Sequence, residues 1–82
     1  MASATYYVAL PFNRGEDGDL AAGEARECQT SAAALREAAR MAASSAGAVA
    51  FSRSGDPGVG EFDDAKILKV FGETPSLDAL TG

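Results

Sequence analysis

One segment of the chain has the apolar periodicity of a helix. Thr30–Gly47 is rich in alanine, the residue with the highest helix propensity, and its apolar residues recur at intervals of three and four. Thr30 or Ser31 can accept a hydrogen bond from a free amide of the first turn, and Gly47 can adopt the left-handed conformation that ends a helix. The pattern therefore predicts one helix with a small apolar face. That face comprises Leu35, Ala38, Ala39, Ala42 and Ala46.

Three other segments alternate between two sets of side chains, which is typical of strands. They are Thr5–Phe12, Ala48–Ser54 and Asp64–Phe71, and they contain aromatic and β-branched residues. We expect the larger apolar set of the first two strands to face the helix. That set is Tyr6, Val8, Leu10, Val49 and Phe51.

The third strand leaves its inward set open. Lys66 and Lys69 fall on opposite faces of a regular strand, so the buried residues are either Ile67 with Phe71 or Leu68 with Val70.

Polar, glycine-containing segments connect these elements. Residues 13–29 contain the turn-forming pair Asp17-Gly18, which predicts a loose hairpin anchored by Leu20. Residues 54–61 contain a proline and three glycines, which predicts a tight turn at Asp56-Pro57-Gly58. Residues 73–82 are expected to form a tail, with one short turn around Ser76–Leu80.

The order of elements predicts a small α+β domain spanning residues 1–72. In this β-α-β-β arrangement one helix packs on a three-stranded mixed sheet, and the helical crossover makes strands one and two parallel. Strand three is antiparallel to strand two. We expect strand three to be central, inserted between the other two, because this gives it two antiparallel pairings. Lys66 and Lys69 favour the alternative, in which it forms an edge.

A single helix can cover only one side of such a sheet. A helix of about 16 residues is about 24 Å long, so the second side stays uncovered. On the expected facing, Tyr7, Ala9, Ala48 and Ala50 point outward and form a flat, semi-apolar interface. We therefore expect a protein-interaction domain that binds a protein partner or forms a homo-oligomer through this face or a sheet edge. The alternative is a monomer that tolerates small outward side chains.

A second functional hypothesis uses the long connections. Loops 13–29 and 53–63 could form a ligand- or ion-binding module. Within the first, Asn13–Glu24 matches part of the EF-hand calcium pattern, although glycine stands at its third position and alanine at its ninth. Within the second, Ser52–Gly60 resembles an anion-binding loop but opens no helix.

The composition argues against catalysis. The chain has no histidine, which excludes imidazole general-base chemistry and histidine-containing zinc sites, and its single cysteine excludes an intramolecular disulfide. Cys28 lies near Arg26 and just before the helix, but no second cysteine or base accompanies it. We expect no enzyme activity, no catalytic residues, no cofactor and no metal site.

Charge and hydropathy restrict the partners. The net charge is −5 and no basic patch stands out, so nucleic acid is not expected as a partner. The N-terminal residues lack the basic start and apolar run of a secretion signal, and no window has the about 20 apolar residues of a membrane span. These features predict a cytoplasmic protein with no membrane partner.

Three stretches carry a resemblance to other proteins. YYVALPF, GEAREC and AGAVAFSRSGDPGVGEFDDAKIL together resemble a group of small uncharacterised bacterial proteins of about this length. The resemblance covers most of the chain and implies no activity and no functional residues. YYVALPF, the following helix and the strand pair are also similar in topology to the first half of SPOR-type peptidoglycan-binding domains, whose second helix and final strand this chain lacks.

Overall fold

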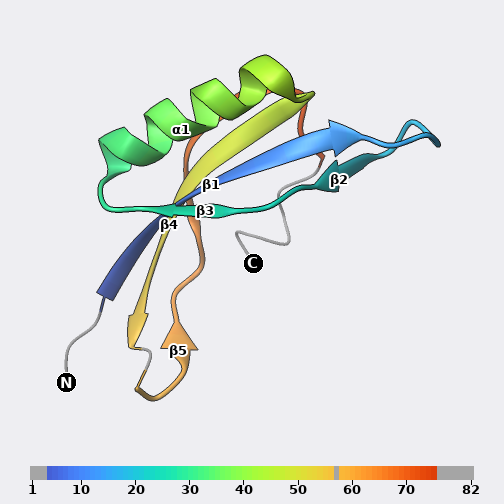
Figure 1. The fold of residues 1–82 in the computed structure, drawn as a ribbon. Coiled ribbons are helices and arrows are strands. Elements are labelled where there is room, and N and C mark those ends of the chain that lie inside the picture. The colour runs from blue at the N-terminus through green and yellow to red at the C-terminus, as the bar shows by residue number, and fades with distance from the viewer. Residues whose placement is uncertain (1–3, 57, 76–82) are drawn as a thin grey trace.

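The computed structural model describes residues 4–56 and 58–75 (Figure 1). Within these ranges six strands and one helix follow one another along the chain. They are β1 (Ala4–Arg14), β2 (Leu20–Ala22), β3 (Arg26–Cys28), α1 (Ser31–Ser44), β4 (Gly47–Asp56), β5 (Glu61–Phe62) and β6 (Lys66–Gly72).

The sheet is built around the two long strands β1 and β4. They pair antiparallel from Ala4↔Gly55 to Phe12↔Gly47. The short strands β2 and β3 follow one another along the other side of β1, and β5 and β6 follow one another along the other side of β4. Every pairing is antiparallel, so the sheet differs from the mixed sheet expected from the sequence.

The predicted order of the strands is wrong. The first two predicted strands, β1 and β4, are direct antiparallel neighbours, and the third, β6, pairs with β4 at the edge instead of lying between them. The reason is β3, which lies within residues 13–29, where a loop was expected. The helix crosses from β3 to β4 over the intervening β1, so the two strands that it joins are parallel to each other and are not neighbours.

The expected hairpin after β1 is confirmed. Gly18 has a φ of 86°, its amide donates to the carbonyl of Gly15 at 3.0 Å, and the Gly15 amide donates to the carbonyl of Asp19 at 2.9 Å. Leu20 then pairs with Arg14 at the start of β2. This reversal sends β2 and β3 back along β1, and so it sets the direction from which the helix starts.

The beginning of α1 agrees with the prediction and its end does not. The hydroxyl of Thr30 accepts a hydrogen bond from the Ala33 amide at 3.0 Å, which confirms Thr30 as the N-cap. The helix ends at Ser44, followed by an extended Ser45. Gly47 does not close the helix, because it is the first residue of β4 and its φ is not positive.

The helix packs on the sheet through alanines. Ala34 and Ala38 of α1 lie against Ala9, Ala48 and Ala50 of the sheet, and all five are fully buried. Small side chains let the helix backbone approach the strands closely. Half-buried residues surround this contact, whereas Ala39, which was expected on the apolar face, is exposed. The surrounding residues are Tyr7, Cys28, Leu35, Met41, Ala42 and Phe71.

The expected facing of the sheet is therefore inverted. Ala9 and Ala50 face the helix, so Val8 and Phe51, which alternate with them, face the other side. Alternation separates the two sets of side chains but does not say which set the helix covers, because both sets are apolar here. The smaller set lies under the helix.

A β-bulge resolves the ambiguity of the last strand. The pairing of β6 with β4 shifts by one residue between Ala50 and Phe51, so Leu68 has no partner in the register. Because of this extra residue, Lys66 and Lys69 both lie on the helix side of the sheet, opposite Ser52 and Ala50. Neither predicted inward set is correct. Ile67 and Val70 share the side opposite α1, and Phe71 lies on the helix side.

After β6 the chain crosses the start of β4. Gly72 has a φ of 67°, the Glu73 amide donates to the carbonyl of Ala46 at 3.0 Å, and the Glu73 carboxylate pairs with Arg14 at 2.8 Å. These contacts anchor residues 73–75, the first part of the expected tail. The turn predicted around 76–80 lies outside the described residues.

Candidate functional site

The large apolar side chains of the sheet lie on the side opposite α1. We call this surface the open face, because α1, the one helix within residues 4–56 and 58–75, packs on the other side. Only part of this face is accessible. Phe12 and Val49 are buried, beside the segment at Glu73 that crosses Gly47 on the same side, whereas Phe62 and Val70, the strand partner of Val49, are 43% and 42% exposed. By register, the open face comprises Tyr6, Val8, Leu10, Phe12, Val49, Phe51, Phe62, Ile67 and Val70.

Aromatic contacts organise one end of the open face. The rings of Tyr6 and Phe62 lie 6.1 Å apart between centroids and are tilted by 49°. The guanidinium of Arg53 lies 5.9 Å from the centroid of Phe62, and its Nε donates to the carbonyl of Asp63 at 3.0 Å. Arg53 thus holds both the ring and the chain that follows β5.

The residues predicted as an interface lie on the other side. Ala9, Ala48 and Ala50 are fully buried beneath α1, and Tyr7 is half-buried beside them. The sequence therefore indicated that one side of the sheet stays without a helix, but it named the residues of the wrong side. Residues buried in the core of one chain cannot contact another chain.

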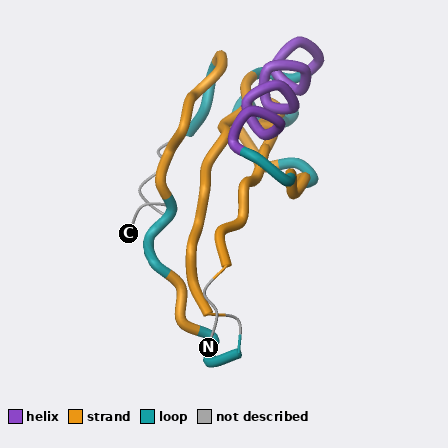
Figure 2. The backbone as a smooth tube through the Cα atoms, turned by 90° about the vertical axis from the view of Figure 1, so that its left-hand side faces the viewer, coloured by secondary structure: helices purple, strands orange, loops and turns teal. Residues whose placement is uncertain are grey.

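The sheet extends beyond α1 at the end where β1 starts and β4 ends. Figure 2 shows the helix on one side of the sheet, over only part of its length, with the strands continuing past it. A cavity of about 230 Å³ lies on the helix side of this extension. We call it the hydroxyl cleft. It is lined by Thr5, Tyr7, Ser52, Ser54, Asp63, Asp64 and Lys66.

The hydroxyl cleft was not predicted. Its residues come from β1, β4, the start of β6 and the segment before it, so no local motif joins them. One feature of the sequence could have indicated the hydroxyl cleft. On the helix side of β4, Ala48 and Ala50 give way to Ser52 and Ser54.

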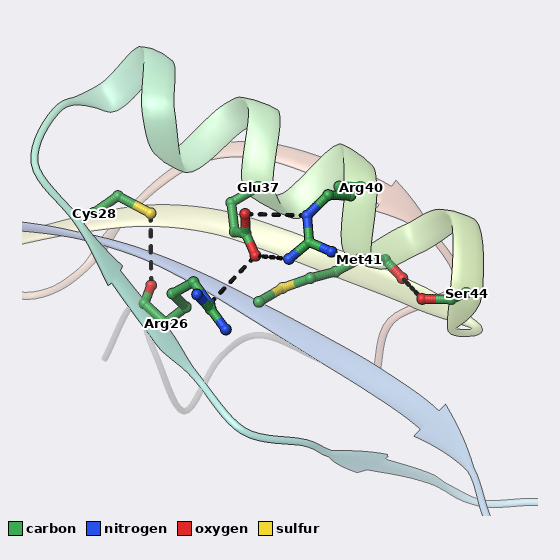
Figure 3. A network of polar contacts seen from close by, with 6 residues as sticks. All are labelled: Arg26, Cys28, Glu37, Arg40, Met41 and Ser44. Carbon is green, nitrogen blue, oxygen red and sulfur yellow. Dashed lines mark hydrogen bonds and ion pairs between the residues drawn. The ribbon is translucent and has the colours of Figure 1, made fainter.

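An ion-pair network connects the helix to β3 (Figure 3). Glu37 of α1 pairs with Arg40 one turn on and with Arg26 of β3, whose Nε lies 3.3 Å from the Glu37 carboxylate. The hydrogen bond from Arg40 has the largest effect on the pKa of Glu37 and lowers it. Burial has the next-largest effect and raises the pKa, whereas the charges of Arg40 and Arg26 lower it further. The network fixes an edge strand to the helix.

The two loops of the second hypothesis have their turns far apart. The turn between β1 and β2 follows the end of β1, and the turn between β4 and β5 follows the end of β4. Because β1 and β4 are antiparallel, these turns lie at opposite ends of the sheet (Figure 1). The end of loop 13–29 returns along β1, where Glu27, Cys28 and Gln29 line a cavity of about 320 Å³ with Thr5. Ser54 and Asp63 of loop 53–63 line the hydroxyl cleft with the same Thr5.

The candidate ion sites in these loops are occupied by the chain's own turn contacts. The Asp17 carboxylate accepts a hydrogen bond from the Asp19 amide at 3.1 Å. The amides of Val59 and Gly60 donate to the carbonyl of Asp56, and the Gly58 amide donates to its carboxylate, so an anion would have to displace these acceptors. In the described part of the chain no group of three or more acidic, cysteine or histidine side chains is placed to hold a metal ion.

Cys28 lies on β3 opposite Tyr7 and is half-buried against the helix. Its Sγ lies 3.8 Å from the carbonyl of Arg26. This position makes it a packing residue at the edge of the core.

Comparisons with protein-family models, with curated proteins and with solved structures found no match for this chain. Among the residues that the structure describes, no helix is long and apolar enough to cross a membrane.

Proposed function

We propose that this chain is a non-catalytic protein-interaction domain that associates with a second copy of itself through the open face. One observation carries this proposal, namely the distribution of side-chain size between the two sides of the sheet. Alanines fill the contact with α1, whereas residues such as Leu10, Phe51 and Val70 lie on the side that α1 leaves uncovered. The accessible part of this side, around Phe62 and Val70, is an apolar patch of the kind that is typical of an interface.

The size of the open face suits a weak dimer. Its residues occupy three strand positions, namely β1, β4, and β5 with β6. Three positions about 4.8 Å apart and about seven residues of about 3.3 Å each give a projected area of roughly 330 Å². This is less than the about 500 Å² that a specific, stable interface buries on each partner, so we expect reversible association.

The charges around the open face also favour a second copy. Its rim carries Arg14, Arg53, Glu27 and Glu73, which is two cations and two anions in a chain of net charge −5. The acidic excess of the chain therefore lies away from this surface. Association through the open face brings few like charges close together.

The edge of the sheet is a poorer docking site than its face. The outer edge strand β6 carries Lys66 and Lys69, and the bulge at Leu68 interrupts its register. Lysines and bulges on an edge strand oppose the addition of another strand. This supports face-to-face packing over extension of the sheet.

The proposal is tested by sedimentation of the full chain over a range of concentrations, with the substitution Val70→Asp. A carboxylate at this exposed position of the open face would be buried without a partner in the dimer, so we expect the dissociation constant to rise at least tenfold. Val59→Asp is the matched control, because Val59 is 56% exposed in the turn before β5, outside the open face.

We expect the wild type and Val59→Asp to form the same dimer and Val70→Asp to be a folded monomer by circular dichroism. A wild type that stays monomeric at every concentration would overturn the proposal. A dimer that Val70→Asp leaves intact would equally exclude the open face as its contact surface.

A further inference from the structure

We infer that the hydroxyl cleft binds a small, uncharged, polyhydroxylated molecule about the size of one six-membered ring. The cleft lies on the α1 side of the sheet, so this inference concerns a different surface from the open face and does not depend on self-association.

The position of the cleft follows from the unequal lengths of helix and strands. The 14 residues of α1 span about 21 Å, whereas the 11 residues of β1 span about 36 Å. Under the helix the sheet presents Ala9, Ala48 and Ala50. Beyond the helix, on the same side, it presents Ser52 and Ser54. The change from methyl to hydroxyl coincides with the end of the helical cover.

The cleft has a floor fixed by hydrogen bonds. The hydroxyls of Thr5 and Ser54 are 2.8 Å apart across β1 and β4. The Asp63 amide donates to the carbonyl of Ser54 at 2.7 Å, and the Asp63 carbonyl accepts from Arg53 at 3.0 Å. The segment that carries the two aspartates is therefore attached to β4 by its backbone, and the wall that it forms is held in place before any ligand arrives.

The lining selects the class of ligand. Tyr7 and Ser52 each carry a hydroxyl that both donates and accepts, and the hydroxyls of Thr5 and Ser54, which pair with each other, keep one donor and their remaining acceptor sites. The two aspartates accept and Lys66 donates. A ligand with a hydroxyl on each carbon can pair with all of these groups. An anion would face both carboxylates, and an apolar molecule would cover the hydroxyls of Tyr7 and Ser52 without offering them a hydrogen bond.

The volume of the hydroxyl cleft limits the size of the ligand. Sites for drug-sized ligands measure about 300–1,000 Å³. At about 230 Å³ the hydroxyl cleft is smaller and suits a single ring. It is open to solvent on one side, so we expect weak binding, with a dissociation constant in the millimolar range.

The test is a titration of the full chain, followed by amide NMR, with myo-inositol as the probe. This molecule is one uncharged ring with a hydroxyl on every carbon. We expect shifts that saturate and that concentrate at Thr5, Ser52, Ser54, Asp63 and Lys66. Cyclohexanol, which keeps the ring and one hydroxyl, is expected to cause no such shifts at tens of millimolar.

Inorganic phosphate and glycine test the other ligand classes. Saturating shifts at the same amides with either of them, and none with inositol, would overturn the assignment of an uncharged polyol. The absence of localised shifts with inositol at tens of millimolar would overturn the binding site itself.

Three substitutions test whether inositol binds in the hydroxyl cleft. Ser52→Ala removes one hydroxyl from the cleft and is expected to weaken inositol binding about fivefold. Ser44→Ala, an exposed serine at the other end of α1, is the matched control and should bind like the wild type. Val70→Asp should also retain binding, because it lies on the open face. Equal weakening by Ser44→Ala and Ser52→Ala would contradict the placement of the site.

Discussion

Gly47 is required by space and not by backbone conformation. A Cβ at this position would lie 2.0 Å from the carbonyl oxygen of Glu73 and 2.6 Å from the amide nitrogen and carbonyl carbon of the same residue. These are backbone atoms of the segment that crosses β4 after β6, so they cannot turn aside as a side chain can. A glycine that looked like the end of a helix instead makes room for a later part of the chain.

The substitution Gly47→Ala should therefore destabilise the fold. We expect the free energy of unfolding to fall by about 2–4 kcal/mol, because the added methyl group must displace the segment after β6. Urea denaturation of both proteins at the same concentration measures the difference. The control is Gly58→Ala, whose Cβ would meet only the Asp56 carboxylate at 3.1 Å, with an expected change within about 0.5 kcal/mol. Equal losses in the two variants would show that the close approach of Glu73 is not the cause.

At the scale of elements, the ion pair between α1 and β3 depends on one carboxylate. The Glu37 side chain is 17% exposed and lies between Arg40 on its own helix and Arg26 on β3. Since β3 has only three residues, its pairing with β1 and this ion pair are the polar contacts that fix it. Without Glu37 the edge strand would be attached less firmly to the helix.

Glu37 should give the stability a specific pH dependence. Its pKa in the folded chain lies below the ordinary value of 4.5, chiefly through the hydrogen bond from Arg40. The stabilisation by its charge is therefore fully present above that ordinary value and is lost as the pH falls through the lowered pKa. Glu37→Gln should be less stable than the wild type at neutral pH, and the difference should shrink toward pH 3. Chemical denaturation across this range measures it.

The control is Glu16→Gln, an exposed residue in the turn between β1 and β2. Its stability should follow that of the wild type at every pH. A difference between wild type and Glu37→Gln that stays constant down to pH 3 would contradict a role for the Glu37 charge.

The elements differ in how far the sequence predicts them. The signals for α1 are local, since its alanines and the Thr30 cap act within one segment. The signals for β2 and β3 are too short to show alternation, and missing β3 was enough to reverse the predicted direction of β1 against β4. The bulge at Leu68 similarly changes which side Lys69 occupies, and nothing next to it in the sequence marks the extra residue.

The candidate surfaces could be predicted only in part, because they too depend on contacts between distant segments. The single helix expected from the sequence can pack on only one side of a sheet, and in residues 4–56 and 58–75 the other side indeed has no helix. The sequence does not show which side, because Val8 and Ala9 belong to two alternating sets that are both apolar. The hydroxyl cleft depends on how β1, β4 and β6 lie beside one another, and that arrangement follows only from the complete topology.

At the scale of the whole molecule, hydrophobic attraction and net charge oppose each other. The open face favours association of two copies, whereas each copy carries a net charge of −5. Two such charges about 25 Å apart repel by roughly 4 kcal/mol in water without salt. Screening lengths of about 30 Å at 0.01 M and about 8 Å at 0.15 M reduce this repulsion to very different extents.

Self-association should therefore become tighter as salt is added. Between about 0.01 M and 0.15 M sodium chloride we expect the dimer dissociation constant to fall roughly tenfold, because most of the repulsion is screened at the higher concentration. Sedimentation at several salt concentrations measures it. The double variant Glu16→Gln with Asp19→Asn removes two negative charges from the β1–β2 turn, so its dimer should depend less on salt. A dissociation constant that rises with salt would mean that ion pairs across the interface, such as Arg53 with Glu27 of the partner copy, hold the two chains together more than their apolar surfaces do.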